Sequence, residues 1–204
     1  ERFLDEVFAS VRLPVSVKTR LGYQDPEEFY KLLEIYNRYP IACLTIHPRV
    51  RPELYKGTVH RDLFVWAVSE SRIPLCYNGD LLTVEDITAV ERDFPTVEAV
   101  MVGRGAVADP ALLRKLRGGP AATRQEVEEF TGELYQAYQD FYGQPGHAAQ
   151  RMKEVWFYLI HLFEGGEKHA KHMRRLHTPR DYEALAAAIF QEPPLRDHAE
   201  GRFA

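Results

Sequence analysis

The sequence predicts an α/β protein in which four strand–helix units are followed by an all-helical region. Up to about residue 118, a short apolar run leads four times through a polar or glycine-containing turn into an amphipathic stretch. After the breaker at residues 118–120, apolar residues recur only at helical spacing. Four parallel strands are half the number that closes a barrel. We therefore expect the C-terminal half of a TIM (β/α)8 barrel over residues 1–118 and a helical domain over residues 119–204.

The expected elements of the first region follow one another along the chain. Residues 1–12 have the pattern of a helix that precedes a strand. Four runs have the length and the branched side chains of buried parallel strands: residues 15–17, 43–46, 73–76 and 99–102. Each leads to a stretch with helical spacing: residues 26–39, 60–71, 83–94 and 106–116. Asp25 with Pro26, and Thr83 in a near capping box, mark two helix starts.

The amino-acid composition and the positions of the cysteines indicate the broad class of protein. The 204 residues are 45% hydrophobic and 27% charged, which fits a globular chain of one or two domains. No apolar run approaches the roughly 20 residues of a membrane span, and the N-terminus lacks the pattern of a signal peptide. We expect a cytoplasmic protein. Cys43 and Cys76 lie inside strand-like runs, so we expect buried thiols and no disulfide framework.

The formal net charge of −4 hides a basic segment between His147 and Arg180. This window holds seven Lys and Arg residues against three Glu, and five of the eight histidines. Such a segment in an otherwise acidic chain indicates a local surface for a polyanion. His169 and His172 have helical i, i+3 spacing, but without cysteines or paired carboxylates nearby we expect a basic helix and no metal site.

Distinctive polar residues follow each strand-like run. They are Lys18, His47, Asn78 with Gly79, and the loop Gly103-Arg104-Gly105, at intervals of 29, 31 and 25 residues, about one strand–helix unit each. We expect them to gather at the C-terminal mouth of the strands, where barrel enzymes keep their chemistry. A cation, an imidazole, an amide and a glycine-rich loop together suit a phosphorylated planar cofactor such as flavin mononucleotide, FMN.

The segments VKTRLG, LTIHPR, YNGD and VMVGRGAVADP, in this order and spacing, resemble the C-terminal half of the tRNA-dihydrouridine synthases. The trailing helical region, with RMKEVWFYL, is similar to the tRNA-binding domain of that family. The resemblance implies FMN as cofactor, NADPH as reductant and reduction of a uridine in tRNA. It places Lys18 and His47 at the flavin ring. It places Asn78, Gly79, Gly103, Arg104 and Gly105 around the phosphate and ribitol.

The same resemblance implies a tRNA surface and a missing part. The expected RNA contacts are Arg49, Arg51, Arg151, Lys153, Lys171, Arg174 and Arg175. The proton-donating cysteine of the family lies in the N-terminal half-barrel, so we expect no catalytic residue in this chain and an inactive fragment. Two alternatives stay open. One is a non-catalytic RNA-binding module, and the other is a different FMN-dependent barrel oxidoreductase that acts on a small metabolite.

Overall fold

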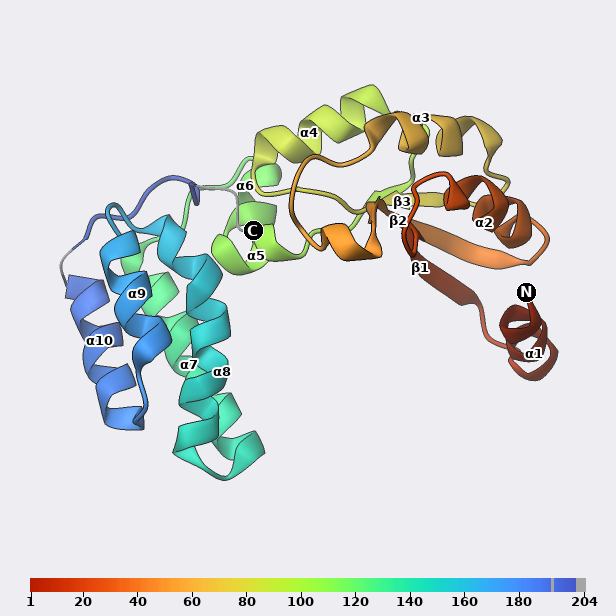
Figure 1. Cartoon of the computed structure of the whole chain (residues 1–204). Coiled ribbons are helices and arrows are strands. Elements are labelled where there is room, and N and C mark those ends of the chain that lie inside the picture. The colour runs from red at the N-terminus through yellow and green to blue at the C-terminus, as the bar shows by residue number, and fades with distance from the viewer. Residues whose placement is uncertain (192, 201–204) are drawn as a thin grey trace. The chain divides into compact units, whose positions relative to one another are not determined.

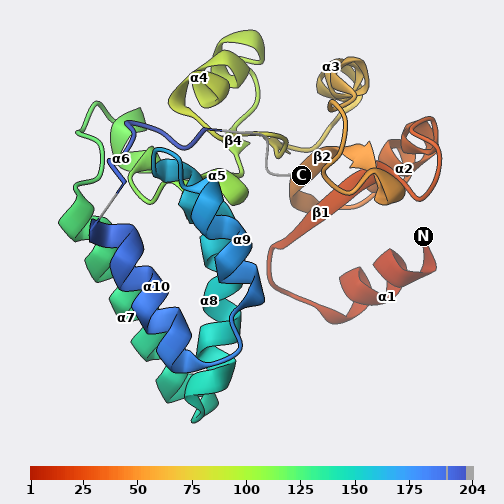
Figure 2. The ribbon, with the colours of Figure 1, turned by 60° about the vertical axis from the view of Figure 1, so that its left-hand side comes forward.

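Four strands pair in chain order, β1-β2-β3-β4, to form one parallel sheet (Figures 1 and 2). The computed structural model describes residues 1–191 and 193–200 of the chain. The strands are β1 (Val15–Gly22), β2 (Ile41–Val50), β3 (Leu75–Tyr77) and β4 (Ala99–Val100). The predicted series of parallel strand–helix units, half the complement of a (β/α)8 barrel, is therefore confirmed.

Three of the four helices that accompany these strands lie on one face of the sheet (Figures 1 and 2). The helices are α1 (Arg2–Ser10), α2 (Glu28–Tyr36), α3 (Arg61–Glu70) and α4 (Val84–Asp93), and α2, α3 and α4 form the layer. The start of α2 is fixed by Glu28, whose carboxylate accepts hydrogen bonds from the backbone N–H groups of residues 23–25 at 2.8–2.9 Å. Asp25 accepts another from the N–H of Glu27, in line with its predicted place at the helix start.

The core of this unit lies between the sheet and that helix layer. Leu44 and Ile46 of β2, Phe29 of α2 and Phe64 of α3 are fully buried. Phe64 packs edge-on against Tyr77 of β3, with ring centroids 4.7 Å apart. Successive side chains of a strand point to opposite faces of the sheet. The residues of β2 that alternate with Leu44 and Ile46 therefore lie on the face away from α2, α3 and α4.

The two long strands correct the prediction for two site residues. We expected Lys18 and His47 just after their strands, but both lie within them, because β1 and β2 keep pairing as far as Gly22 and Val50. The register shifts between Arg20 and Gly22, so the pairing continues past an irregularity that the sequence pattern does not show. Asn78 directly follows β3, as predicted.

The second unit of the chain is helical. Of the described residues it contains 82–84, 103–191 and 193–200, while residues 1–81 and 85–102 make up the first unit. Its helices are α5 (Arg104–Ala108), α6 (Leu112–Leu116), α7 (Arg124–Tyr142), α8 (Pro145–Leu159), α9 (Glu167–Arg175) and α10 (Pro179–Gln191), with a 3-10 turn at Ile160–Leu162. The helix expected over residues 106–116 is two helices, because the proline at position 110 favours the extended backbone observed for Asp109.

Local signals in the sequence explain the long helices. Thr123 and Glu126 form a capping box at the start of α7, and Gly143 ends that helix in the left-handed conformation, with φ of 62°. Helices α7, α8, α9 and α10 pack side by side (Figure 2), around a core that includes Trp156 and Phe163. The indole of Trp156 donates to the hydroxyl of Tyr182 at 3.3 Å. The predicted domain boundary after residue 118 stays a prediction.

Candidate functional site

The polar residues predicted at the strand ends lie in register along the sheet. Arg20 of β1 pairs with His47 of β2, and the N–H of Asn78 donates to the carbonyl of Ile46 at 3.0 Å, which places Asn78 beside His47. Lys18 lies two residues before Arg20 and therefore on the same face. The structure thus brings Lys18, Arg20, His47 and Asn78 together on the face of the sheet away from the helix layer.

Of these four residues, Arg20 was not predicted from the sequence. Its guanidinium donates to the carbonyls of Val50 and Leu54, both at 2.9 Å, and lies 5.7 Å from the centre of the Tyr55 ring. It therefore fixes the segment that follows β2. The signal was present in VKTRLG, since a strand that contains Lys18 and continues past it must place Arg20 on the same face.

Lys18 and His47 have distinct electrostatic surroundings. Lys18 is exposed, yet partial desolvation of its ammonium group and the positive charge of Arg20 lower its pKa. His47 is only 4% exposed. Burial, and then the charges of Arg20, Arg49 and Lys18, lower the pKa of His47 to about 4. At neutral pH the site therefore holds a neutral imidazole beside cationic side chains.

Arg49 corrects the prediction of an RNA contact. Its side chain has no exposed surface, and its guanidinium forms a two-point ion pair with the carboxylate of Asp80, at 2.9 and 2.7 Å. The remaining contacts go to the carbonyls of Lys56 and Gly57 and to the ring of His47. Arg49 thus joins the loops that follow β2 and β3, and it is not available to RNA.

The glycines of the site differ in what surrounds them. A Cβ atom on Gly79 would lie 3.0–3.3 Å from side-chain atoms of Val59, Tyr77 and Pro48, so the role of Gly79 is close packing between loops. The amide nitrogen of Asn78 donates to the carbonyl of Met101 at 2.7 Å, which holds this side chain against the end of β4.

The loop Gly103-Arg104-Gly105 belongs to the second unit, where it leads into α5. No atom lies within 4 Å of the position that a Cβ atom of Gly103 would take, so Gly103 is not packed against the rest of the described structure on that side. Gly105 is buried and Arg104 is partly buried. The open backbone at Gly103 is the feature of this loop that fits the predicted phosphate contact.

The residues predicted to bind RNA fall into two groups. Three have partners within the protein: Arg51 donates to the hydroxyl of Tyr23 at 2.7 Å, Arg151 forms an ion pair with Glu154 at 2.8 Å, and Lys153 donates to the carbonyl of Leu176. Lys171, Arg174 and Arg175 on α9 are exposed and form no ion pair or hydrogen bond within residues 1–191 and 193–200. As far as the described residues show, these last three are the cations of the predicted surface without a partner.

The other candidate groups of the sequence are placed as follows. Cys43 in β2 and Cys76 in β3 are free thiols, and burial raises the pKa of both. Among the described residues, no three His, Cys, Asp or Glu side chains come together as metal ligands would. None of the helices in the described part of the chain combines the length and apolar character that a membrane crossing requires.

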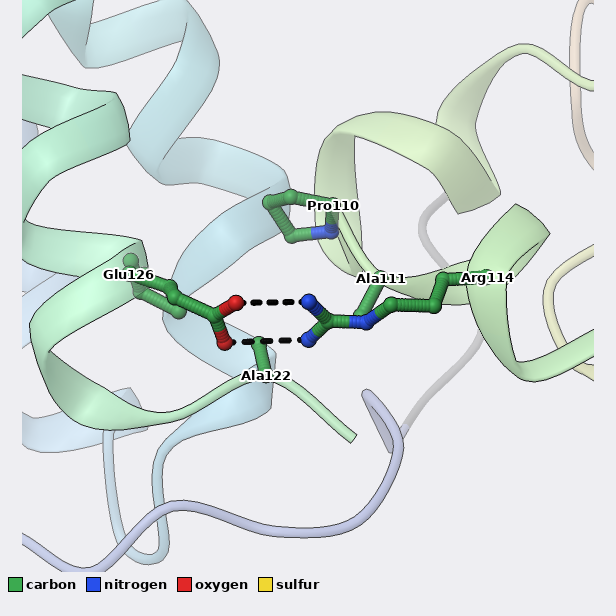
Figure 3. Close-up of a pocket in the computed structure, with 6 residues that line it drawn as sticks. Pro110, Ala111, Arg114, Ala122 and Glu126 are labelled. Atoms are coloured by element: carbon green, nitrogen blue, oxygen red, sulfur yellow. Dashed lines mark hydrogen bonds and ion pairs between the residues drawn. The ribbon is translucent and has the colours of Figure 1, made fainter. Parts of the chain in front are cut away.

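A cavity in the second unit, about 210 Å³ in volume, was not expected from the sequence (Figure 3). Arg114 lines this cavity and donates to both carboxylate oxygens of Glu126, at 2.5 and 2.9 Å. Its other donors go to the carbonyls of Pro120 and Ala121 at 3.0 Å. Because its donors are used in this way, Arg114 ties α6 to the start of α7.

The fold and these polar residues define a parallel α/β protein whose sheet carries cations and hydrogen-bond donors on the face away from the helix layer. Comparison with known proteins then gives the family. The model of the dihydrouridine synthase (Dus) family matches residues 1–192, and the chain belongs to this family. Its resemblance to the tRNA-dihydrouridine synthases is therefore confirmed.

Individual relatives agree with the family assignment. A probable tRNA-dihydrouridine synthase of Rhizobium leguminosarum is 28% identical over 92% of this chain and 58% of its own length. Another, of Rickettsia bellii, is 30% identical over 81% of this chain and 53% of its own length. The tRNA-dihydrouridine synthase B of Pseudomonas putida is 28% identical over 93% and 58%. The chain thus spans somewhat more than half the length of these curated relatives.

Proposed function

We propose that this chain provides cofactor and tRNA contacts of a tRNA-dihydrouridine synthase, which uses FMN and NADPH to reduce a uridine of tRNA to 5,6-dihydrouridine. The observation that carries the proposal is the register of Lys18, Arg20, His47 and Asn78 on one face of the sheet, in a chain of this family. Family membership gives the reaction class, and the row gives residues suited to a flavin.

The donor set supports an anionic, carbonyl-rich ligand such as FMN. Lys18 and His47 would lie toward the flavin ring, where the ammonium group of Lys18 stabilises negative charge. Asn78 would contact the ribitol and phosphate, together with Gly103, Arg104 and Gly105. Gly79, which we also predicted as a contact, supports this cradle through its packing. When bound, FMN supplies the hydride chemistry, while the side chains of this chain bind and orient it.

The proposal assigns the proton donor to a cysteine outside this chain. Cys43 and Cys76 lie inside β2 and β3, which does not match the loop cysteine of the family. We also propose that residues 119–204 form the tRNA-binding part and that the protein works in the cytoplasm. The exposed cations of α9, Lys171, Arg174 and Arg175, support the tRNA contact through phosphate binding.

The flavin part of the proposal is tested with the gene that encodes this chain. Expression of the full-length gene that contains this sequence, in a strain that lacks its own dihydrouridine synthases, should restore dihydrouridine in tRNA, measured by nucleoside mass spectrometry. Purified protein should show the visible absorption of bound flavin, and Lys18→Ala should slow reduction of the flavin by NADPH. A protein that binds flavin, forms no dihydrouridine and does not bind tRNA would instead favour a flavoenzyme that acts on a small metabolite.

The tRNA part is tested by the salt dependence of binding. Replacing Lys171, Arg174 and Arg175 together with Gln should make the salt dependence of binding weaker. The magnitude of the slope of log K against log salt should fall by up to about three, about one for each lost phosphate contact. Arg117→Gln is the control, because Arg117 is an exposed cation outside the set predicted to bind RNA. An unchanged slope in the triple variant would remove α9 from the tRNA surface. Tight tRNA binding without flavin or dihydrouridine would favour a non-catalytic RNA-binding module.

A further inference from the structure

The imidazole of His47 is surrounded by groups from three strands and their loops. Lys18 and Arg20 of β1 contribute positive charge, and Asp80 after β3 contributes negative charge. The ring of Tyr55 stacks on the imidazole, with centroids 5.9 Å apart and planes within 29° of parallel. These neighbours act on His47 through charge and packing.

Arg49 contacts His47 in a different way. Its Nη1 atom lies 3.2 Å from Nε2 of His47, within hydrogen-bond distance, and both side chains are buried. A guanidinium carries five N–H groups and has no acceptor, and it keeps its proton in proteins. Nε2 of His47 must therefore be the acceptor of this hydrogen bond, so it carries no hydrogen.

The orientation of Arg49 is fixed by its remaining contacts. Nε donates to the carbonyl of Lys56 at 3.2 Å, and Nη2 donates to the carbonyl of Gly57 at 2.7 Å. Nη1 and Nη2 each donate to one carboxylate oxygen of Asp80. With the bond to His47, these contacts use all five N–H groups, so the guanidinium has no donor left for another arrangement.

We propose that Arg49, held by Asp80, fixes His47 as the neutral tautomer with its proton on Nδ1, and that His47 serves the site as a hydrogen-bond donor. Nδ1 forms no hydrogen bond to any of the described residues. The atom that it binds in a ligand must be an acceptor, such as a carbonyl oxygen of a flavin or pyrimidine ring. This inference deepens the proposed function and rests on it only for the identity of that ligand.

The proposal also excludes another role for His47. A neutral imidazole whose Nε2 atom accepts from Arg49 does not deliver a proton to the substrate at neutral pH. The low pKa of His47, which follows from burial and from the nearby cations, agrees with this assignment. Arg49 is then a positioning residue that acts through His47, because it touches neither the proposed cofactor nor the substrate.

The first test reads the tautomer in the parent protein without flavin and uses one variant only to assign the signals. In the chain labelled with 15N histidine, two-bond proton–nitrogen correlation spectra at pH 7 distinguish the two neutral tautomers, and a spectrum of His47→Gln identifies the His47 signals. We expect a single Nδ1–H form. Labelling arginine as well should reveal a scalar coupling across the hydrogen bond between Arg49 Nη1 and His47 Nε2. An Nε2–H form, a mixture of both forms or a protonated ring would overturn the proposal.

Substitutions then distinguish the effect of Arg49 on the His47 tautomer from the effects of neighbouring cations. Arg49→Met should let Nε2 gain the proton in a large fraction of molecules. Arg20→Met should raise the pKa of His47 and leave its tautomer unchanged, because Arg20 forms no hydrogen bond to the imidazole and acts on it through charge. Arg51→Met is the matched control in the same segment and should change neither. Retention of the Nδ1–H form in a folded Arg49→Met variant would contradict the proposal. If this variant does not fold, the scalar coupling in the parent decides whether Arg49 is the donor.

These measurements stand apart from the test of the proposed function. The tautomer is read in the protein without cofactor, whereas the proposed function is judged by flavin absorption and by dihydrouridine in tRNA. A chain that binds no flavin would fail the second test and still pass the first.

Discussion

Replacing His47 with Gln should make the stability of the protein less sensitive to mild acid. In the folded protein the pKa of His47 is about 4, against an ordinary value of 6.5. Between these two pH values the unfolded chain binds a proton at this position and the folded protein does not. Stability must therefore fall as the pH falls through this window, and the Gln variant lacks this contribution.

The size of the effect follows from the two pKa values. One pKa unit corresponds to about 1.4 kcal/mol, so between pH 7 and pH 4 His47 should cost the parent about 3 kcal/mol of stability. The assay is urea unfolding of the parent and of His47→Gln, followed by circular dichroism at several pH values. Carboxylates and other histidines titrate in both proteins and cancel in the difference. Parallel curves of unfolding free energy against pH would refute the reasoning, because they would mean that His47 keeps an ordinary pKa in the folded state.

Further predictions concern packing and charge. Gly79→Ala should lower the melting temperature, because overpacking costs roughly 1–3 kcal/mol of stability. Gly103→Ala should leave the melting temperature unchanged and weaken FMN binding in a fluorescence titration. Equal melting temperatures for the two variants would contradict the packing role of Gly79. Asp80→Asn should lower the urea unfolding free energy by roughly 3 kcal/mol, because it leaves the buried charge of Arg49 without its carboxylate, and an unchanged midpoint would show that the pair contributes little. Arg114 and capping contacts lower the pKa of Glu126 to about 2. The unfolding free energy of the parent should therefore exceed that of Glu126→Gln by its full amount above about pH 4.5, and this difference should disappear as the pH falls toward 2. A difference in unfolding free energy that does not depend on pH would argue against this ion pair.

Much of the fold could be predicted because the relevant signals are local. The apolar runs identified all four strands, and Thr123 with Gly143 marks the ends of α7. Strand length could not be predicted in the same way. The continuation of β1 and β2 depends on hydrogen bonds between strands distant in sequence, and residues after Lys18 and His47 lack the apolar character used to recognise a strand.

The candidate site was predictable in its position and less so in its detail. Lys18, His47 and Asn78 were identified from spacing, and the register brings them together. Arg49 looked like a surface cation because it lies close to a loop, and nothing in one sequence reveals that Asp80, 31 residues later, forms a two-point ion pair with it. Such a pair depends on tertiary structure, where a buried guanidinium requires a carboxylate partner.

The guanidinium of Arg49 also has a consequence for motion. It joins backbone carbonyls of the segment after β2 to the carboxylate of the segment after β3, so neither segment can open without breaking several of its bonds. Native-state hydrogen exchange should therefore find the amides of residues 56–57 and 78–80 exchanging as one cooperative unit, with a common opening free energy, although residues 58–77 separate them in the sequence. Any ligand that orders one of these segments would then slow exchange in the other.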